Sequence, residues 1–210
     1  EFALSAKVTR VVPDTLQNFK QFGLRETVVY AQSEHLEMTS GPLLPELEGA
    51  LKADPDVLAP VQGSVVTLDR LILGLVAGRK VIVTGKLLRA RVQAASLTLT
   101  SLDKLQTRSL KKGDSLVMTA APVLLGGTFA VWKLRTDDGF EGSIFTTQRS
   151  FILTPARASD AAVSEAAVIQ KCEGDPSVLT FENPPLAHYY DRATVTIAAN
   201  VADATHAATV

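Results

Sequence analysis

The segment Phe129-Ala-Val-Trp-Lys-Leu-Arg-Thr-Asp-Asp-Gly-Phe-Glu-Gly-Ser-Ile-Phe145 contains two runs of alternating apolar residues around an Asp138-Gly139 pair. Alternation of this kind is typical of strands that bury one of their two faces. An Asp-Gly pair supplies the backbone conformation that a tight hairpin turn needs. The segment therefore predicts an antiparallel hairpin, with Trp132 on the face that enters the core.

Strand-forming residues are abundant along the whole chain. Its 210 residues include 22 Val and 20 Thr, and both favour strands because branching at Cβ restricts χ1. A second hairpin is expected around a turn at 174–177, which joins two further apolar runs. In all, we predict short strands at 2–12, 26–32, 64–69, 79–85, 96–100, 115–120, 129–135, 141–145, 150–154, 165–171, 177–181 and 194–197.

Turn-forming residues gather at two places, 41–60 and 155–161. We therefore predict a mainly β protein with two small barrel-like or sandwich-like modules and short connecting helices, one module being inserted in the other. The predicted domains are a set of N-terminal strands with a proline-rich connector (1–60), a β-barrel-like module (61–90 plus 156–210) and an inserted β module (91–155).

The predicted insertion of one module in the other determines which strands should pair. Residues 79–84 should open the barrel-like module and pair with the hairpin at 163–181, and not only with strands between 96 and 152. The chain should then cross between the two modules near Arg89 and again near Pro155.

Helical signals are few and short. Residues 14–20 could form one turn, and Pro45 opens a segment that has Leu44, Leu47 and Leu51 on one face. Proline is well suited to the first turn of a helix, and this spacing of leucines matches a helical repeat. Both segments are predicted to be short connectors.

Overall charge excludes several classes of function. The chain has 21 Lys and Arg against 22 Asp and Glu, with a pI of about 6.4, so it lacks the basic surface typical of proteins that bind nucleic acid or anionic membranes. The longest uncharged stretch, 115–132, is interrupted by proline and glycine, so we expect a soluble protein without a membrane span. The cations of the mildly basic middle are expected on a solvated face: Arg89, Arg91, Arg108, Lys111 and Lys112.

The residue types needed for catalysis or metal binding are scattered. A nucleophile needs a base and an orienting acid, but no Gly-x-Ser-x-Gly turn is present. The lone Cys172 excludes an internal disulfide and a cysteine zinc site, and is expected to be a small buried hydrophobe in a strand. The run His188-Tyr189-Tyr190-Asp191 is interpreted as a turn before the last strand. We predict no catalytic, cofactor-binding or metal residues, because the other candidates lack the spacing of a chelate, a calcium loop or a phosphate loop: His35, Glu37, Gly126, Gly127, Asp137, Asp138 and His206.

Several stretches carry a family resemblance: Phe2-Ala-Leu-Ser-Ala-Lys-Val-Thr-Arg10, Leu24-Arg-Glu-Thr-Val-Val-Tyr-Ala-Gln-Ser-Glu34, Val66-Thr-Leu-Asp-Arg70 with Leu75-Val-Ala-Gly-Arg-Lys-Val-Ile-Val-Thr-Gly85, and Pro185-Leu-Ala-His-Tyr-Tyr-Asp-Arg-Ala-Thr-Val-Thr-Ile-Ala-Ala-Asn-Val201. In content, order and spacing they resemble the baseplate assembly proteins of phage-tail-like contractile injection systems. The likeness is densest over 1–85 and 160–206. Between these ranges only Asp137-Asp-Gly-Phe-Glu-Gly142 and Leu153-Thr-Pro-Ala156 are similar.

The resemblance implies a structural role without catalysis. Proteins of this family resemble wedge subunits of the baseplate, between the spike and the contractile sheath. The implied partners are therefore a neighbouring wedge protein, the hub or spike, and the sheath, with assembly in the cytoplasm followed by incorporation into the injection particle. Family members are far longer, so we expect an internal fragment of a longer chain, and we find no secretory signal.

Other function classes stay open at this point. A carbohydrate-binding β module for cell-surface recognition is the main alternative, and it would place exposed aromatic rings against sugar faces. Besides its phenylalanines, the sequence offers Tyr30, Trp132, Tyr189 and Tyr190 for this purpose. A hydrolase would need two convergent acids, whose separation in space a sequence does not show.

Overall fold

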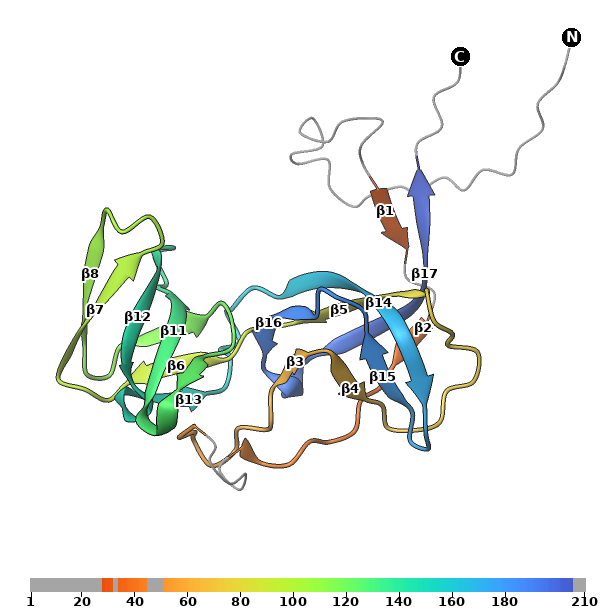
Figure 1. The fold of residues 1–210 in the computed structure, drawn as a ribbon, viewed down its shortest axis with the longest axis horizontal. Coiled ribbons are helices and arrows are strands. Elements are labelled where there is room, and N and C mark those ends of the chain that lie inside the picture. The colour runs from red at the N-terminus through yellow and green to blue at the C-terminus, as the bar shows by residue number, and fades with distance from the viewer. Residues whose placement is uncertain (1–27, 32–33, 45–50, 206–210) are drawn as a thin grey trace, which may run out of the picture. The chain divides into compact units, whose positions relative to one another are not determined.

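The computed structural model describes residues 28–31, 34–44 and 51–205 (Figure 1). Strands make up 53% of the structure, no helix among the described residues reaches seven residues, and one sheet curls into a half-barrel. The mainly β fold predicted from the sequence is therefore confirmed. The predicted strand at 2–12, the turn at 14–20, most of the predicted helix after Leu44, and His206 lie outside the described residues.

The chain divides into two compact units, residues 1–31 with 203–210 and residues 32–202. In the first unit, the structure describes β1 (Val28–Ala31) and the end of β17 (Thr196–Thr205). The second unit holds all the other described elements, including the 3₁₀ turns η3 (Gly126–Thr128), η4 (Gln148–Ser150) and η5 (Arg192–Thr194).

One antiparallel sheet of the second unit is built around β5 (Lys80–Gly85). Its side chains alternate between half-buried and buried, which places Val81 and Val83 in the core. On one side β5 pairs with β17, which also pairs with β2 (Glu34–Leu36). On the other side the order continues through β14 (Val163–Glu173), β15 (Val178–Phe181) and β4 (Val65–Thr67).

The pairing predicted for residues 79–84 is present. β5 pairs with β14 from Val163 opposite Gly85 to Val168 opposite Lys80. β14 and β15 form the second predicted hairpin, with Gly174 at a positive φ of 90° in its turn. The half-buried Cys172 lies in β14 against the core, so it is in a strand as predicted but is only partly buried.

A second antiparallel sheet contains the hairpin predicted around Asp138 and Gly139. β11 (Phe129–Arg135) pairs with β12 (Glu141–Thr147) from Phe129 opposite Thr147 to Arg135 opposite Glu141, and Gly139 has a φ of 88° at the turn. The sheet order is β13-β6-β9-β11-β12-β7-β8, and β10 also pairs with β11. The remaining bounds are β6 (Arg89–Val92), β7 (Ser96–Ser101), β8 (Thr107–Lys111), β9 (Ser115–Met118), β10 (Val123–Leu125) and β13 (Phe151–Thr154).

Trp132 lies at the centre of the core of the second sheet. Its side chain has no exposed surface, and its ring lies 4.7 Å from that of Phe151. The predicted position of Trp132 on the buried face of the hairpin is therefore confirmed. The other apolar residues of this core include Leu88, Ala90, Leu99, Leu116, Met118, Leu134 and Leu153.

The chain enters the second sheet after β5 and leaves it after β13. A small sheet of β3 (Val61–Gly63) and β16 (Leu186–Tyr190) lies beside the point of entry. There the amide of Leu88 donates to the carbonyl of Tyr189 at 3.0 Å, and the amide of Asp191 donates to the carbonyl of Lys86 at 2.8 Å. The domain boundaries themselves, 1–60, 61–90 plus 156–210 and 91–155, stay a prediction.

Six strands have no counterpart in the sequence prediction: β2, β3, β6, β8, β10 and β16. In β8 only Leu110 is buried, so no apolar alternation marks the strand. In β6 the buried side chains include a charged one, that of Arg89. The interpretation of residues 188–191 as a turn was wrong for its first three residues, which lie in β16 because Tyr189 and Tyr190 pack into two different cores.

Gly142 allows β12 to approach β7. A Cβ atom at this position would overlap the backbone carbonyl oxygen of Thr100, which cannot rotate away. We predict that Gly142→Ala lowers the free energy of unfolding by about 1–3 kcal/mol. Urea denaturation followed by the fluorescence of Trp132 measures this, with Ser143→Ala as a neighbouring control expected to stay within about 0.5 kcal/mol. Equal stability of the two variants would contradict the pairing.

Candidate interaction surface

A buried arginine connects the turn of the β11–β12 hairpin to the rest of the unit. The side chain of Arg89 is only 1% exposed. Its guanidinium donates to Ser115 Oγ and to the Ser115 carbonyl, both at 2.9 Å, to Asp160 Oδ1 at 2.7 Å, and to Asp137 Oδ1. Because these four bonds use most of its donors, the buried charge is paired and its polar groups are satisfied.

Arg157 completes this network from the segment that returns from β13 to β14. Its guanidinium donates to Asp137 Oδ2 at 2.9 Å, and its amide donates to Asp160 Oδ2 at 2.7 Å. The Arg89 guanidinium holds the pKa of Asp137 below its ordinary value, with a smaller contribution from Arg157. The network therefore joins β6, the hairpin turn and the returning segment.

The expectation that the basic residues of the middle form a solvated face was wrong for Arg89. Arg91 and Arg108 are more exposed, but each is paired as well, Arg91 with Asp54 at 2.8 Å and Arg108 with Asp138 at 2.7 Å. Asp137 and Asp138 do lie at the turn of the hairpin, as predicted. A pattern of single charges in a sequence cannot show which of them is buried, because burial depends on acids supplied by distant segments.

A hollow of about 410 Å³ lies beside this hairpin turn. It contains Arg108 and Arg157 together with Asp114, Asp137 and Asp138. The two arginines are already paired with Asp138 and Asp137. Asp114, the third acid, accepts a hydrogen bond from the amide of Lys111 at 2.7 Å, so the described residues of the hollow offer no unpaired cation to a ligand.

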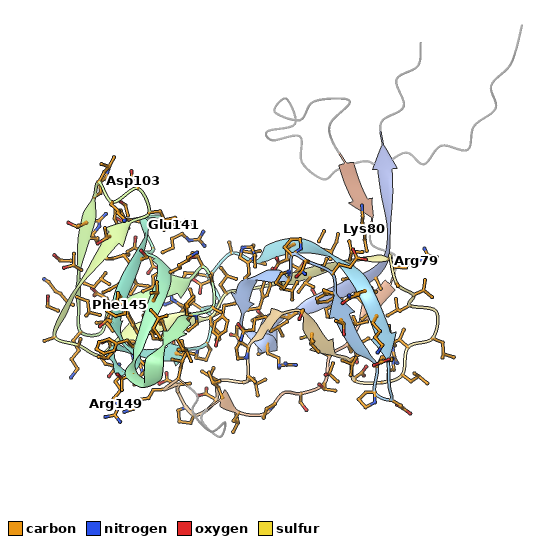
Figure 2. All side chains as sticks on the ribbon, viewed as in Figure 1. Arg79, Lys80, Asp103, Glu141, Phe145 and Arg149 are labelled. Carbon is orange, nitrogen blue, oxygen red and sulfur yellow. The ribbon has the colours of Figure 1, made fainter. Side chains whose placement is uncertain are left out.

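An apolar face on the outside of the second sheet is the most unusual surface feature of the described residues. Phe129 is 42% exposed and Phe145 62% exposed, and their rings stack at 5.3 Å with an interplanar angle of 16°. Val131 lies opposite Phe145, and Leu125 opposite Phe129, so these side chains share one side of the sheet. Figure 2 labels Phe145 on this face. We call Val123, Leu125, Phe129, Val131 and Phe145 the apolar face.

A groove lies at the end of the sheet where β10 ends and β11 begins. Its volume is about 720 Å³. Two cations, Lys52 and Arg149, line it, and none of the described lining residues is acidic. Figure 2 labels Arg149, which follows β12 in η4. The described residues that line it are Leu51, Lys52, Leu124, Gly127, Thr128, Thr147, Gln148 and Arg149.

The structure separates most candidate residues that the sequence analysis considered. His35 and Glu37 are exposed at β2, and Gly126 and Gly127 form η3 beside the groove. Nδ1 of His188 lies 3.3 Å from Oε1 of Glu165, without the geometry of a hydrogen bond. In the part of the chain that the structure describes, no three His, Cys, Asp or Glu side chains are placed to hold a metal ion.

The aromatic residues of β16 are structural. Tyr189 is 4% exposed and Tyr190 is fully buried. Burial raises the pKa of Tyr189 to about 12, and burial is also the main cause that raises the pKa of Tyr190. Asp191 accepts hydrogen bonds from the amides of Ala193 and Ala156, at 3.2 and 2.9 Å, so it caps η5 and holds the returning segment.

Comparison with known proteins adds no assignment, because no family model, curated protein or solved structure matches this chain. Within the described residues, no helix is both long and apolar enough to cross a membrane. The apolar face and the groove beside it are therefore the candidate site on geometric grounds alone. Neither was predicted from the sequence, although the alternation of β11 and β12 already places phenylalanines on the side of the sheet opposite to Trp132.

The ion pair between Arg89 and Asp137 should make stability depend on pH. The folded-state pKa of Asp137 lies below its ordinary value of 3.8, so the pair stabilises the fold above about pH 4, and this contribution is lost as pH falls through the lowered folded-state pKa. We predict that Asp137→Asn shows a smaller loss of unfolding free energy between about pH 5 and pH 3 than the unaltered chain. Urea denaturation at each pH measures it.

The exposed Asp56, which lies outside the network, provides the matched control. Asp56→Asn should keep the pH dependence of the unaltered chain. The role given to Asp137 would be contradicted if the two variants had the same pH profile.

Proposed function

We propose that this chain is a structural component of the baseplate of a phage-tail-like contractile injection system, a scaffold that binds neighbouring subunits and catalyses no reaction. The apolar face carries the proposal that the chain works by binding other proteins. The largest contiguous apolar patch on a protein surface is often an interaction site. The baseplate assignment has a different support, the four stretches of sequence that resemble baseplate assembly proteins.

Other apolar side chains reach the surface away from this face. Leu102 and Leu105, 63% and 82% exposed, lie between β7 and β8. Leu71 and Leu73, 48% and 86% exposed, lie in the connection between β4 and β5. A subunit with several neighbours needs several contact sites, and this distribution supports a scaffold better than a protein with a single ligand.

The proposed mechanism is a change of contacts between two assembled states. A scaffold of this kind transmits force if its own sheets stay rigid while its interfaces rearrange. The network around Arg89 supports such rigidity, because it ties the hairpin turn and the connection that returns to the first sheet to β6. The proposed location follows from the role: assembly in the cytoplasm and then incorporation into the injection particle, with wedge, hub or spike, and sheath subunits as partners.

A carbohydrate-binding module is the second candidate. Trp132, Tyr189 and Tyr190 are buried and offer no platform for a sugar. The exposed and stacked rings of Phe129 and Phe145 are the observation that favours this candidate. A glycan array probed with the unaltered chain and with Phe145→Ala separates the two functions, because loss of micromolar glycan binding in the variant would support sugar recognition.

Baseplate membership predicts that the protein containing this chain is present in purified injection particles. We expect Phe145→Glu in that protein to reduce the yield of complete particles severalfold, because a charge would be placed in a desolvated contact. Val65→Glu, at a 52% exposed residue of β4 in the other sheet, is the control for the effect of a charge at any exposed apolar position, and it should leave the yield unchanged. Electron microscopy and mass spectrometry of purified particles provide the measurement. Absence of the protein from the particles would contradict the proposal.

A further inference from the structure

We propose that the free edge of β10, with the adjoining groove, binds an extended segment of a partner protein that carries apolar side chains and at least one acidic side chain. The segment would lengthen the second sheet by one strand. This inference rests on the proposed function in one respect only, because it names the kind of partner that the scaffold binds. It identifies that partner by its chemistry.

The edges of the second sheet are protected at β13 and β8. Beside β13, the amide of Leu153 donates to the carbonyl of Lys52, and the amide of Asp54 donates to the carbonyl of Leu153, both at 2.9 Å. β8 is covered by no strand among the described residues but carries the exposed charges of Arg108 and Lys111. Covering segments and charged side chains are the usual ways in which proteins prevent unwanted strand pairing.

β10 has neither protection. Val123, Leu124 and Leu125 are 54%, 50% and 45% exposed, and the strand contains no charged residue. β10 pairs with β11 on one side, and on its other side its backbone has no hydrogen bond to another described residue. An exposed strand edge with apolar side chains can accept a further strand from another protein, with backbone hydrogen bonds for affinity and side-chain contacts for specificity.

The groove provides the charge that selects the partner. Leu124, Gly127 and Thr128 place one wall of the groove directly after the free edge of β10. Arg149 and Lys52 line the groove, and neither forms an ion pair with an acid in the part of the chain that the structure describes. A segment paired along β10 would therefore bring its end to two cations that have no ion-pair partner among the described residues. Charge complementarity then favours a glutamate or aspartate there.

The test uses the 210-residue chain and two short synthetic peptides. Each peptide has alternating valine and threonine after a pair of charged residues, glutamates in one and lysines in the other, with both ends capped. Binding is followed by changes in the backbone amide NMR signals of the labelled chain. We expect the glutamate peptide to shift the signals of 123–125 and of Arg149, and to bind at least about fivefold more tightly than the lysine peptide.

Variants separate the contributions of charge and of the free edge. Arg149→Glu should lower the affinity for the glutamate peptide about fivefold. Lys112→Glu, at an exposed lysine outside the groove, should change this affinity less than twofold. Leu124→Ser should lower the affinity for both peptides by the same factor. The amide spectrum of each variant shows that it is folded before its affinity is compared.

Equal affinities for the two peptides, or signal changes at β8 in place of β10, would overturn the inference. These outcomes are independent of whether the parent protein is found in injection particles. A chain that binds the glutamate peptide but is absent from particles would keep this inference and overturn the proposed function. A chain that is present in particles but binds neither peptide would keep the proposed function and overturn this inference.

Discussion

The ion pairs of the buried Arg89 guanidinium with Asp137 and Asp160 are the interaction on which the path of the chain through the second sheet depends. A cation without solvent is strongly destabilising unless acids and hydrogen-bond acceptors surround it. Its acids come from two segments far apart in sequence, Asp137 at the hairpin turn and Asp160 in the return to the first sheet. Both segments must therefore reach β6, where the chain enters the second sheet, and this fixes how the chain enters and leaves it.

The two sides of the second sheet have opposite relations to water, and β11 contributes to both. Trp132 faces a closed core, whereas Phe129, on the other side of the same strand, stacks on Phe145 in solvent. Side chains alternate along a strand, so a strand with apolar residues on both sides needs cover on both. The chain covers one side itself. The other side is the reason that we propose a role in assembly.

Local chemistry explains which parts of the fold were predictable. The β11–β12 turn depends on Asp138 and Gly139 themselves, and the strand character of β5 and β14 depends on their own alternation, so both could be derived from short stretches. β6 and β8 were missed because one buries a charge and the other has a single buried residue. The candidate site was missed for a related reason. Apolar alternation shows that a strand has two faces but does not show whether other segments cover each of them.

The chain's own sequence was sufficient for a mainly β fold and for the two hairpins, because these follow from side-chain periodicity and turn chemistry. The pairing of β5 with β14 was predicted from a different argument, the interpretation of the two segments as parts of one small barrel. It also led to the resemblance on which the baseplate proposal rests. Only the tertiary structure decided that Arg89 is buried, that β13 is covered while β10 is open, and that Lys52 and Arg149 share a groove. Each of these depends on contacts between residues distant in sequence, and burial and pairing are properties of such contacts.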